Sequence, residues 1–118
     1  MNNITEYKFI LLLNNDFIFS KIEIEKPING FLKLINPLRV LMSEDDESVS
    51  YNFIPWIPFT KDTVIPLASK SIVTITSLSE EHIDLYNKAL ENITEKFNSM
   101  NKLNEEQNIL DKNDILLN

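Results

Sequence analysis

The chain has no cysteine, and it has only one residue each of glycine, tryptophan and histidine. Without cysteine there is no disulfide, no thiol nucleophile and no cysteine-ligated zinc site, and this composition fits a reducing compartment. The lone histidine, His82, has no second ligand type near it in the sequence, so neither a metal site nor general-base catalysis is supported. We therefore expect a protein that is not an enzyme and that needs no cofactor or metal.

Long hydrophobic runs are also missing. The apolar run over residues 10–13 is far too short to span a bilayer. The amino-terminal residues do not form a basic segment followed by an apolar core, as a secretion signal would. We expect a soluble, cytoplasmic protein without a membrane partner, and its 118 residues suffice for one domain with a modest core.

Positive charge is scarce, since the chain has a net charge of −7. This balance argues against a general nucleic-acid binder, whose affinity comes from many lysine and arginine contacts to phosphate. The charge is uneven, however. Residues 1–76 hold seven basic and nine acidic side chains, whereas residues 77–118 hold four basic and nine acidic ones. The first part is therefore close to neutral and can present a local basic face.

Alternating apolar and polar residues predict a mainly β domain over residues 1–78. Strands are expected over residues 7–13, 17–25, 31–42, 48–53 and 65–76. Asn36 and Pro37 interrupt the third strand and predict a bulge or a sharp bend, because proline lacks a backbone donor. Gly30 is interpreted as a position where a side chain would obstruct the backbone. Long bent strands of this kind predict a five-stranded, strongly bent antiparallel open barrel.

A single long helix is predicted over residues 79–103. The spacing from Ser77 to Glu80 is that of a capping box. Apolar residues then recur at alternating spacings of three and four: Ile83, Tyr86, Leu90, Ile93, Phe97 and Met100. This helix is longer than a small sheet needs, so two interpretations stay open: packing on the sheet for half of its length, or helix–helix contact between subunits. Residues 104–118 are predicted to be a polar, flexible tail.

An aromatic and proline-rich segment, residues 48–59, follows the acidic residues 44–47. The acidic residues lack the spacing of a calcium-binding loop and are interpreted as a solvated hairpin turn. Pro55 and Pro58 are three positions apart, so their missing N–H donors would face opposite neighbouring strands. Regular pairing on both sides therefore cannot continue through both prolines, and an edge, a bulge or a loop begins there. The strand before Pro55 is predicted to pair across a subunit boundary. Trp56 is interpreted as a core or interface anchor in preference to an exposed stacking surface.

Several segments resemble the Sm/LSm-like proteins, a family that includes the bacterial Hfq proteins. Residues 12–20 are similar to the opening of the first Sm motif, and residues 25–29 resemble its acidic loop, which ends in Asn29. Residues 69–75 resemble the second motif in its Hfq form, with Lys70 at the position of the motif's histidine. A more specific resemblance, to the Sm-like proteins of marine cyanophages and ocean metagenomes, covers three runs: residues 36–40, 55–59 and 86–88.

The resemblance implies an Sm-like barrel assembled as a homo-oligomeric ring, in which the fourth strand of one subunit pairs with the fifth strand of the next. The predicted interface residues are Tyr51, Phe53, Trp56, Val73 and Ile75. The family also implies that single-stranded RNA or DNA binds near the ring's pore. The predicted nucleic-acid-binding residues are Asn29, Ser69, Lys70 and Ser71. A phage-encoded protein of this kind would act in the host cytoplasm.

Three departures from the family pattern bear on this interpretation. Pro27 stands where the family carries a stacking aromatic residue, Ala68 and Ser69 replace an Arg-Gly pair, and the helix follows the barrel where the family's helix precedes it. Asn29 can also be interpreted simply as a turn-forming residue, and Lys70 can be interpreted as an ordinary exposed lysine. The competing prediction is a protein-interaction or scaffold module whose acidic helix and tail recruit a partner, without binding nucleic acid.

Overall fold

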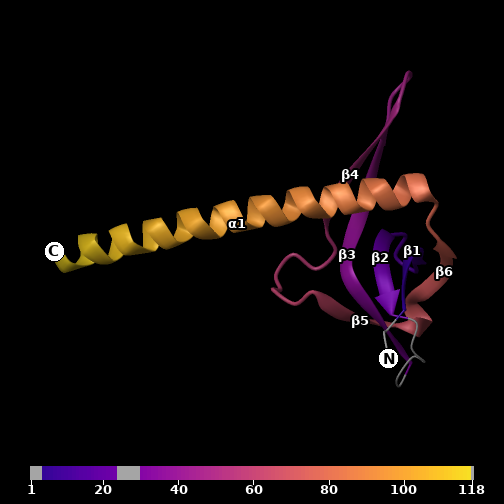
Figure 1. Ribbon diagram of the computed structural model, residues 1–118, viewed down its shortest axis with the longest axis horizontal. Coiled ribbons are helices and arrows are strands. Elements are labelled where there is room, and N and C mark those ends of the chain that lie inside the picture. The colour runs from indigo at the N-terminus through magenta and orange to yellow at the C-terminus, as the bar shows by residue number, and fades with distance from the viewer. Residues whose placement is uncertain (1–3, 24–29, 118) are drawn as a thin grey trace.

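The computed structural model describes residues 4–23 and 30–117, and the side chains of residues 4–23 and 30–100. In this part of the chain, six strands form one antiparallel sheet and one long helix follows them (Figure 1). The elements are β1 (Thr5–Leu12), β2 (Phe17–Glu23), β3 (Phe31–Glu44), β4 (Val49–Pro55), β5 (Val64–Ala68), the 3-10 turn η1 (Ser69–Ser71), β6 (Ile72–Ser77) and α1 (Glu80–Leu117).

The sheet has the strand order β4-β3-β2-β1-β6, and β5 also pairs with β3. A mainly β fold with an open antiparallel sheet and a carboxy-terminal helix is thereby confirmed. The number of strands differs from the expected five, because the segment predicted as one strand over residues 65–76 is divided by η1. Two serines flank Lys70 in η1, and serine favours turns over a continuous ladder.

The predicted interruption of the third strand is confirmed as a bulge. Phe19 lies opposite Leu38, but Lys21 lies opposite Ile35, so β3 has one residue more than β2 at this point. Asn36 has a φ of 51°, the left-handed conformation that bulges use and that asparagine tolerates. Since side chains alternate along a strand, the extra residue reverses which face of the sheet the later side chains of β3 occupy.

The strand that pairs with the outer side of β3 also changes at the bulge. β4 pairs with the second half of β3 and β5 with the first half. Residues 56–63 leave and return at the bulge, where the N–H of Trp56 donates to the Pro37 carbonyl at 3.1 Å and the N–H of Asn36 donates to the Thr63 carbonyl at 2.7 Å. The prediction that regular pairing stops at Pro55 is confirmed, because β4 ends there.

Two apolar clusters lie on opposite faces of the sheet. The inner cluster, away from the helix, contains Ile10, Leu12, Ile18, Ile22, Leu34 and Leu67. The outer cluster lies beneath α1 and contains Phe19, Leu38, Val40 and Tyr86. Leu34 and Leu38 are four positions apart, which would place them on the same face of a regular strand, but they belong to different clusters because of the bulge.

The helix begins later and ends later than predicted. Its first residue is Glu80, and the N–H of His82 donates to the Ser79 hydroxyl at 3.4 Å, so the capping residue is Ser79 and the predicted capping box at Ser77 is wrong. Ser77 instead ends β6. The helix does not end at residue 103 but continues to Leu117. No glycine or proline follows Ser79 in the sequence, so no backbone breaker stops it.

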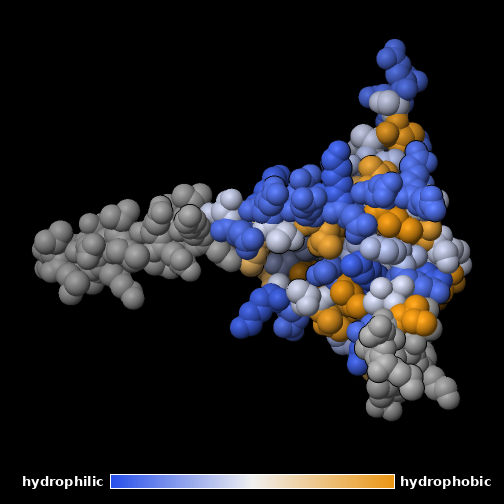
Figure 2. All heavy atoms as spheres, viewed as in Figure 1, coloured by the Kyte–Doolittle hydropathy of each residue, from blue (hydrophilic) through white to orange (hydrophobic). Residues whose placement is uncertain are grey.

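The described contacts of α1 with the sheet lie in its first half. Leu90 and Ile93 pack against the outer cluster, and beyond them the helix projects past the sheet (Figure 1). Figure 2 shows hydrophilic residues over the outer side of α1 and hydrophobic residues at its border with the sheet. Packing on the sheet along part of the helix is therefore confirmed, and contact between helices of different subunits stays a prediction.

Tyr86 fastens the helix to the bulge. Its side chain is completely buried, and its hydroxyl donates to the Asn36 carbonyl at 2.7 Å, with the Ile35 carbonyl 3.2 Å away. The Tyr86 ring packs edge-on against Tyr7 at a centroid distance of 5.8 Å. A bulge leaves backbone groups outside the regular ladder, and here a side chain from α1 satisfies one of them.

Gly30 has a different role from the predicted one. A Cβ built at this position would meet nothing within 4 Å, so a side chain would not obstruct the backbone there. The φ of Gly30 is +77°, in the left-handed region that glycine adopts at least cost. The position needs glycine because of its backbone conformation and not because of close packing.

Candidate functional site

The predicted binding residues Ser69, Lys70 and Ser71 form the turn η1, between β5 and β6. Ser69 and Lys70 are exposed, and Ser71 is half-buried. The N–H of Ser69 donates to the Gly30 carbonyl at 2.8 Å, and the Ser71 carbonyl accepts from the N–H of Leu13 at 2.9 Å. η1 is thereby joined to Gly30, just before β3, and to Leu13, in the turn between β1 and β2.

Asn29, the fourth predicted binding residue, lies outside the described residues, as does Pro27. The residue after Asn29 is Gly30, whose carbonyl is bonded to Ser69. The structure therefore brings Gly30, the residue that directly follows the segment resembling the acidic loop, next to the segment that resembles the second motif. These two segments are about 40 residues apart in the sequence.

Two exposed residues of β3 extend this site and were not predicted. Phe31 is 47% exposed and lies opposite Ala68, and the exposed Lys33 lies opposite Pro66. Both therefore lie on the strand that pairs with β5, just before η1. Their signal in the sequence is the alternation with Leu32 and Leu34, which assigns them to the same side of a half-exposed strand.

The acidic residues 44–47 lie far from this site. They form the tip of the hairpin between β3 and β4, which projects from the sheet at the opposite end from β5 (Figure 1). The Asp45 carboxylate accepts the N–H groups of Glu47 and Ser48, both at 3.1 Å. These bonds lower the pKa of Asp45 below its ordinary value. The Asp45 carboxylate thus organises the hairpin tip, and the four acidic residues lie too far away to neutralise Lys70 at close range.

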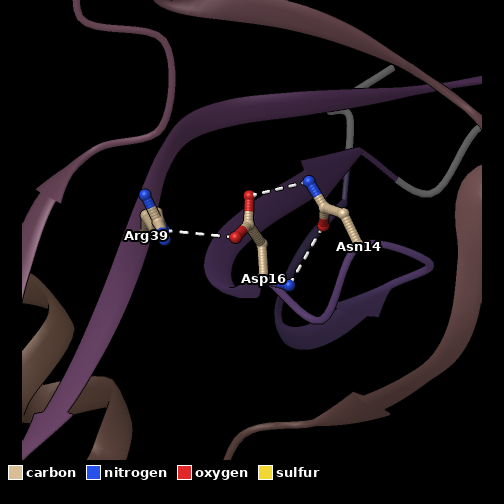
Figure 3. A network of polar contacts seen from close by, with 3 residues as sticks. All are labelled: Asn14, Asp16 and Arg39. Carbon is tan, nitrogen blue, oxygen red and sulfur yellow. Dashed lines mark hydrogen bonds and ion pairs between the residues drawn. The ribbon is translucent and has the colours of Figure 1, made fainter.

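The only arginine in the sequence has a structural role. Nε of Arg39, from β3, lies 3.3 Å from Oδ1 of Asp16, in the turn between β1 and β2 (Figure 3). Asn14 accepts the N–H of Asp16 at 3.0 Å and donates its amide N–H to the Asp16 carboxylate at 3.1 Å. This network fixes the β1–β2 turn against β3, so Arg39 is not a member of the candidate binding site.

The predicted interface strands are the two ends of the sheet. β4 and β6 each pair with one neighbour along the path of the sheet, so each has an outer edge with no partner among the described residues. Val73, at 56% exposure, and Ile75 expose apolar surface on β6, and Tyr51 does so on β4. Exposed apolar side chains on an unpaired edge strand are typical of strands that pair with another chain.

The other two predicted interface residues are partly covered within their own chain. Phe53 packs against Phe19 in the outer cluster at a centroid distance of 5.5 Å. Trp56 packs against the inner cluster and lines a cavity of about 350 Å³ with Ser71 and Pro66. The interpretation of Trp56 as a core anchor agrees with this position.

His82 also has a structural setting. Its Nδ1 lies 2.6 Å from the Ser79 hydroxyl, and its ring packs edge-on against Phe19 and Tyr51 at centroid distances of 5.9 and 6.3 Å. Within the described residues, no three or more histidine, cysteine, aspartate or glutamate side chains are grouped so that they could hold a metal ion. None of the described helical residues forms an apolar stretch long enough to cross a membrane.

No protein-family model matches this chain, and no curated protein matches it. The functional interpretation therefore depends on the site itself. An exposed lysine, Lys70, lies in a tight turn whose Ser69 is hydrogen-bonded to Gly30, and the sheet has outer edges on β4 and β6 that have no partner among the described residues.

Proposed function

We propose that this chain is a ring-forming Sm-like protein that binds single-stranded RNA or DNA near the ring's pore, without catalysis, in nucleic-acid processing or regulation. The observation that carries the proposal is the 2.8 Å hydrogen bond from the Ser69 N–H to the Gly30 carbonyl. It joins the second-motif segment to Gly30, the residue that directly follows the segment resembling the acidic loop, and this contact supports a binding site built from both segments.

The positions of the unpaired edges support the ring. β4 and β6 stand at opposite ends of one sheet, so pairing β4 of one subunit with β6 of the next is a head-to-tail contact. Head-to-tail contacts generate a closed ring when the rotation between subunits closes. Such pairing would satisfy the backbone groups of both edges and would cover Tyr51, Val73 and Ile75.

Assembly also changes the electrostatic argument against nucleic-acid binding. A ring repeats Lys70 around its axis, and a ring of lysines concentrates positive charge that one subunit with a net charge of −7 does not display. The exposed Phe31, next to Gly30, supplies an aromatic face near the same turn. Bases stack on aromatic side chains irrespective of sequence, so Phe31 can take the role that the aromatic residue missing at Pro27 has in the family.

The test is fluorescence anisotropy with short U-rich and A-rich oligonucleotides. We expect binding that weakens with salt, and loss of binding in Lys70→Glu. Lys61→Glu is the matched control, because Lys61 is also an exposed lysine but lies in the loop of residues 56–63. Phe31→Ala should weaken binding about 5- to 150-fold, the equivalent of about 1–3 kcal/mol for one stacked base. Phe59→Ala, which removes a 97% exposed aromatic elsewhere, should leave binding unchanged.

The competing function is a scaffold whose acidic helix recruits a protein partner. It is favoured by the length of α1 that projects beyond the sheet and by the excess of acidic residues over residues 77–118. Absence of oligonucleotide binding at micromolar concentrations, with the ring intact by native mass spectrometry, would support the scaffold and exclude the nucleic-acid function. A strict monomer at all concentrations would contradict both the ring and the Sm resemblance.

A further inference from the structure

α1 crosses its own sheet from the β6 end towards the β4 and β5 end. Just before the helix, the N–H of Leu78 donates to the Tyr7 carbonyl at 3.1 Å, beside β6. Tyr86 then reaches the bulge in β3. Ile93 and Phe97 line a cavity together with Pro55, at the end of β4. The helix therefore leaves the sheet over the edge that carries β4 and β5 (Figure 1).

The part of α1 beyond this edge is long. Residues 98–117 remain after Phe97, and at 1.5 Å per residue they extend about 30 Å. Five strands spaced about 4.8 Å apart are about 19 Å wide, so the projecting part is long enough to cross a second sheet of this size. Two apolar side chains are exposed where the projecting part begins: Phe97, just before it, is 54% exposed, and Met100, in its first turn, is 62% exposed.

An apolar groove of about 370 Å³ lies on the helix-bearing face, beside the first turn of α1. Each of the five strands in the order β6-β1-β2-β3-β4 contributes one or two side chains to its lining. In that order they include Ser77, Phe9, Phe17, Met42 and Tyr51. His82 borders the groove from α1. The groove therefore runs across the sheet next to the start of α1, and its Ser77 end lies at the β6 edge.

We propose that the projecting part of α1 lies in this groove of the neighbouring subunit, so that each helix is an arm that clamps the next subunit of the ring. The inference rests on the proposed pairing of β4 with β6 of the next subunit. That pairing brings the neighbour's β6, and hence the Ser77 end of its groove, to the edge over which α1 leaves. Rotational symmetry keeps all helices on one side of the ring. Phe97 and Met100 then lie at the subunit boundary and continue the apolar contact into the groove.

The absence of cysteine allows a direct test with the double variant Ser77→Cys/Met100→Cys. Within one chain, residues 80 and 100 of α1 are about 30 Å apart along the helix axis. A disulfide requires Cα atoms within about 7 Å, so these two cysteines can link only between chains. We expect mild oxidation to produce a ladder of covalent oligomers that ends at the size of the native ring.

Controls separate the arm from other arrangements. Ser77→Cys/Ser99→Cys should give little ladder, because Ser99 lies about 100° from Met100 around the helix. A covalent dimer from Met100→Cys alone would indicate symmetric pairing of helices and would overturn the arm. An intact ring by native mass spectrometry, without a ladder, would overturn the arm and leave the proposed ring standing. A monomer in the same measurement would overturn both.

A second measurement does not depend on cysteine chemistry. Met100→Asp should raise the protein concentration needed for half-maximal assembly at least tenfold, because it places a charge against the apolar groove. Ser99→Asp adds the same charge on a neighbouring position of the helix and should change assembly little. Equal effects of the two substitutions would contradict the proposed docking.

Discussion

The hydrogen bond from Tyr86 to the bulge of β3 makes a quantitative prediction about stability. Tyr86→Phe removes only the hydroxyl, which donates to the Asn36 carbonyl at 2.7 Å, and it keeps the ring that packs on Tyr7. The Tyr86 side chain is completely buried, so loss of its hydroxyl leaves the half-buried Asn36 carbonyl without this donor. We expect a loss of about 1–3 kcal/mol in the free energy of unfolding. Tyr86→Ala, which also removes the ring, should cost about 3–5 kcal/mol.

Urea unfolding followed by the fluorescence of Trp56 measures this loss, and thermal unfolding should show a decrease in Tm of about 4 °C per kcal/mol. Tyr51→Phe is the matched control, because the Tyr51 side chain is exposed. A loss below roughly 0.5 kcal/mol in Tyr86→Phe, the range of ordinary surface substitutions, would refute the idea that this hydroxyl holds the helix on the bulge.

The same side chain predicts a dependence on alkaline pH. Burial raises the pKa of Tyr86 above the usual value for tyrosine. Between the unfolded pKa of about 10 and the higher folded pKa, the unfolded chain loses this proton while the folded protein keeps it. The contribution of Tyr86 is therefore fully present below pH about 10 and is lost as the pH rises further. Tyr86→Phe should lack this part of the decrease in stability, and an identical alkaline profile would contradict the assignment.

Two further predictions concern backbone turns. Asn36→Val should lower the free energy of unfolding in urea by about 1–3 kcal/mol, because a β-branched residue disfavours the φ of 51°. Asn36→Gly should stay within about 1 kcal/mol of wild type. Equal effects of the two substitutions would show that the backbone conformation of the bulge is not the cause. Asp45→Ala should speed hydrogen exchange at the amides of Glu47 and Ser48, since both donate to its carboxylate. The pKa of Asp45 is lowered, so the carboxylate stays charged and the wild-type protection should persist at neutral pH. The protection should disappear as the pH falls below 3.8, the ordinary pKa of aspartate. Protection that is independent of pH would contradict this role of Asp45.

Most of the local structure could be predicted from the sequence, because strands and helices leave periodic patterns. Alternation located the strands to within a few residues, and Pro37 marked the bulge correctly. The capping residue of the helix was predicted two positions too early, at Ser77 instead of Ser79. Both serines are good capping residues, and only the pairing of Ser77 within β6 excludes Ser77 as the cap. The end of the helix was missed, because the polar residues after 103 have no apolar seam and yet contain no residue that breaks a helix.

The candidate site could be predicted only in part. Lys70 and its serines were identified through the Sm resemblance, whereas Phe31 and Lys33 were overlooked, because their position beside η1 depends on which strand β5 pairs with. That pairing is set by a register between residues about 30 to 37 positions apart. A sequence pattern shows which residues share a face of one strand, but it does not show which other strand lies next to it.

The sequence by itself determined the elements and their chemistry: alternating strands, an interrupted third strand, a long helix, a chain without reactive thiols, and an acidic carboxy-terminal third. Only the tertiary structure decided that residues 65–76 form two strands around a tight turn, that Gly30 meets Ser69, and that Tyr86 reaches the bulge. The physical reason is that periodicity and propensity act over a few neighbouring residues. Long-range register and the direction in which α1 leaves the sheet depend instead on how both faces of the whole sheet are buried at once.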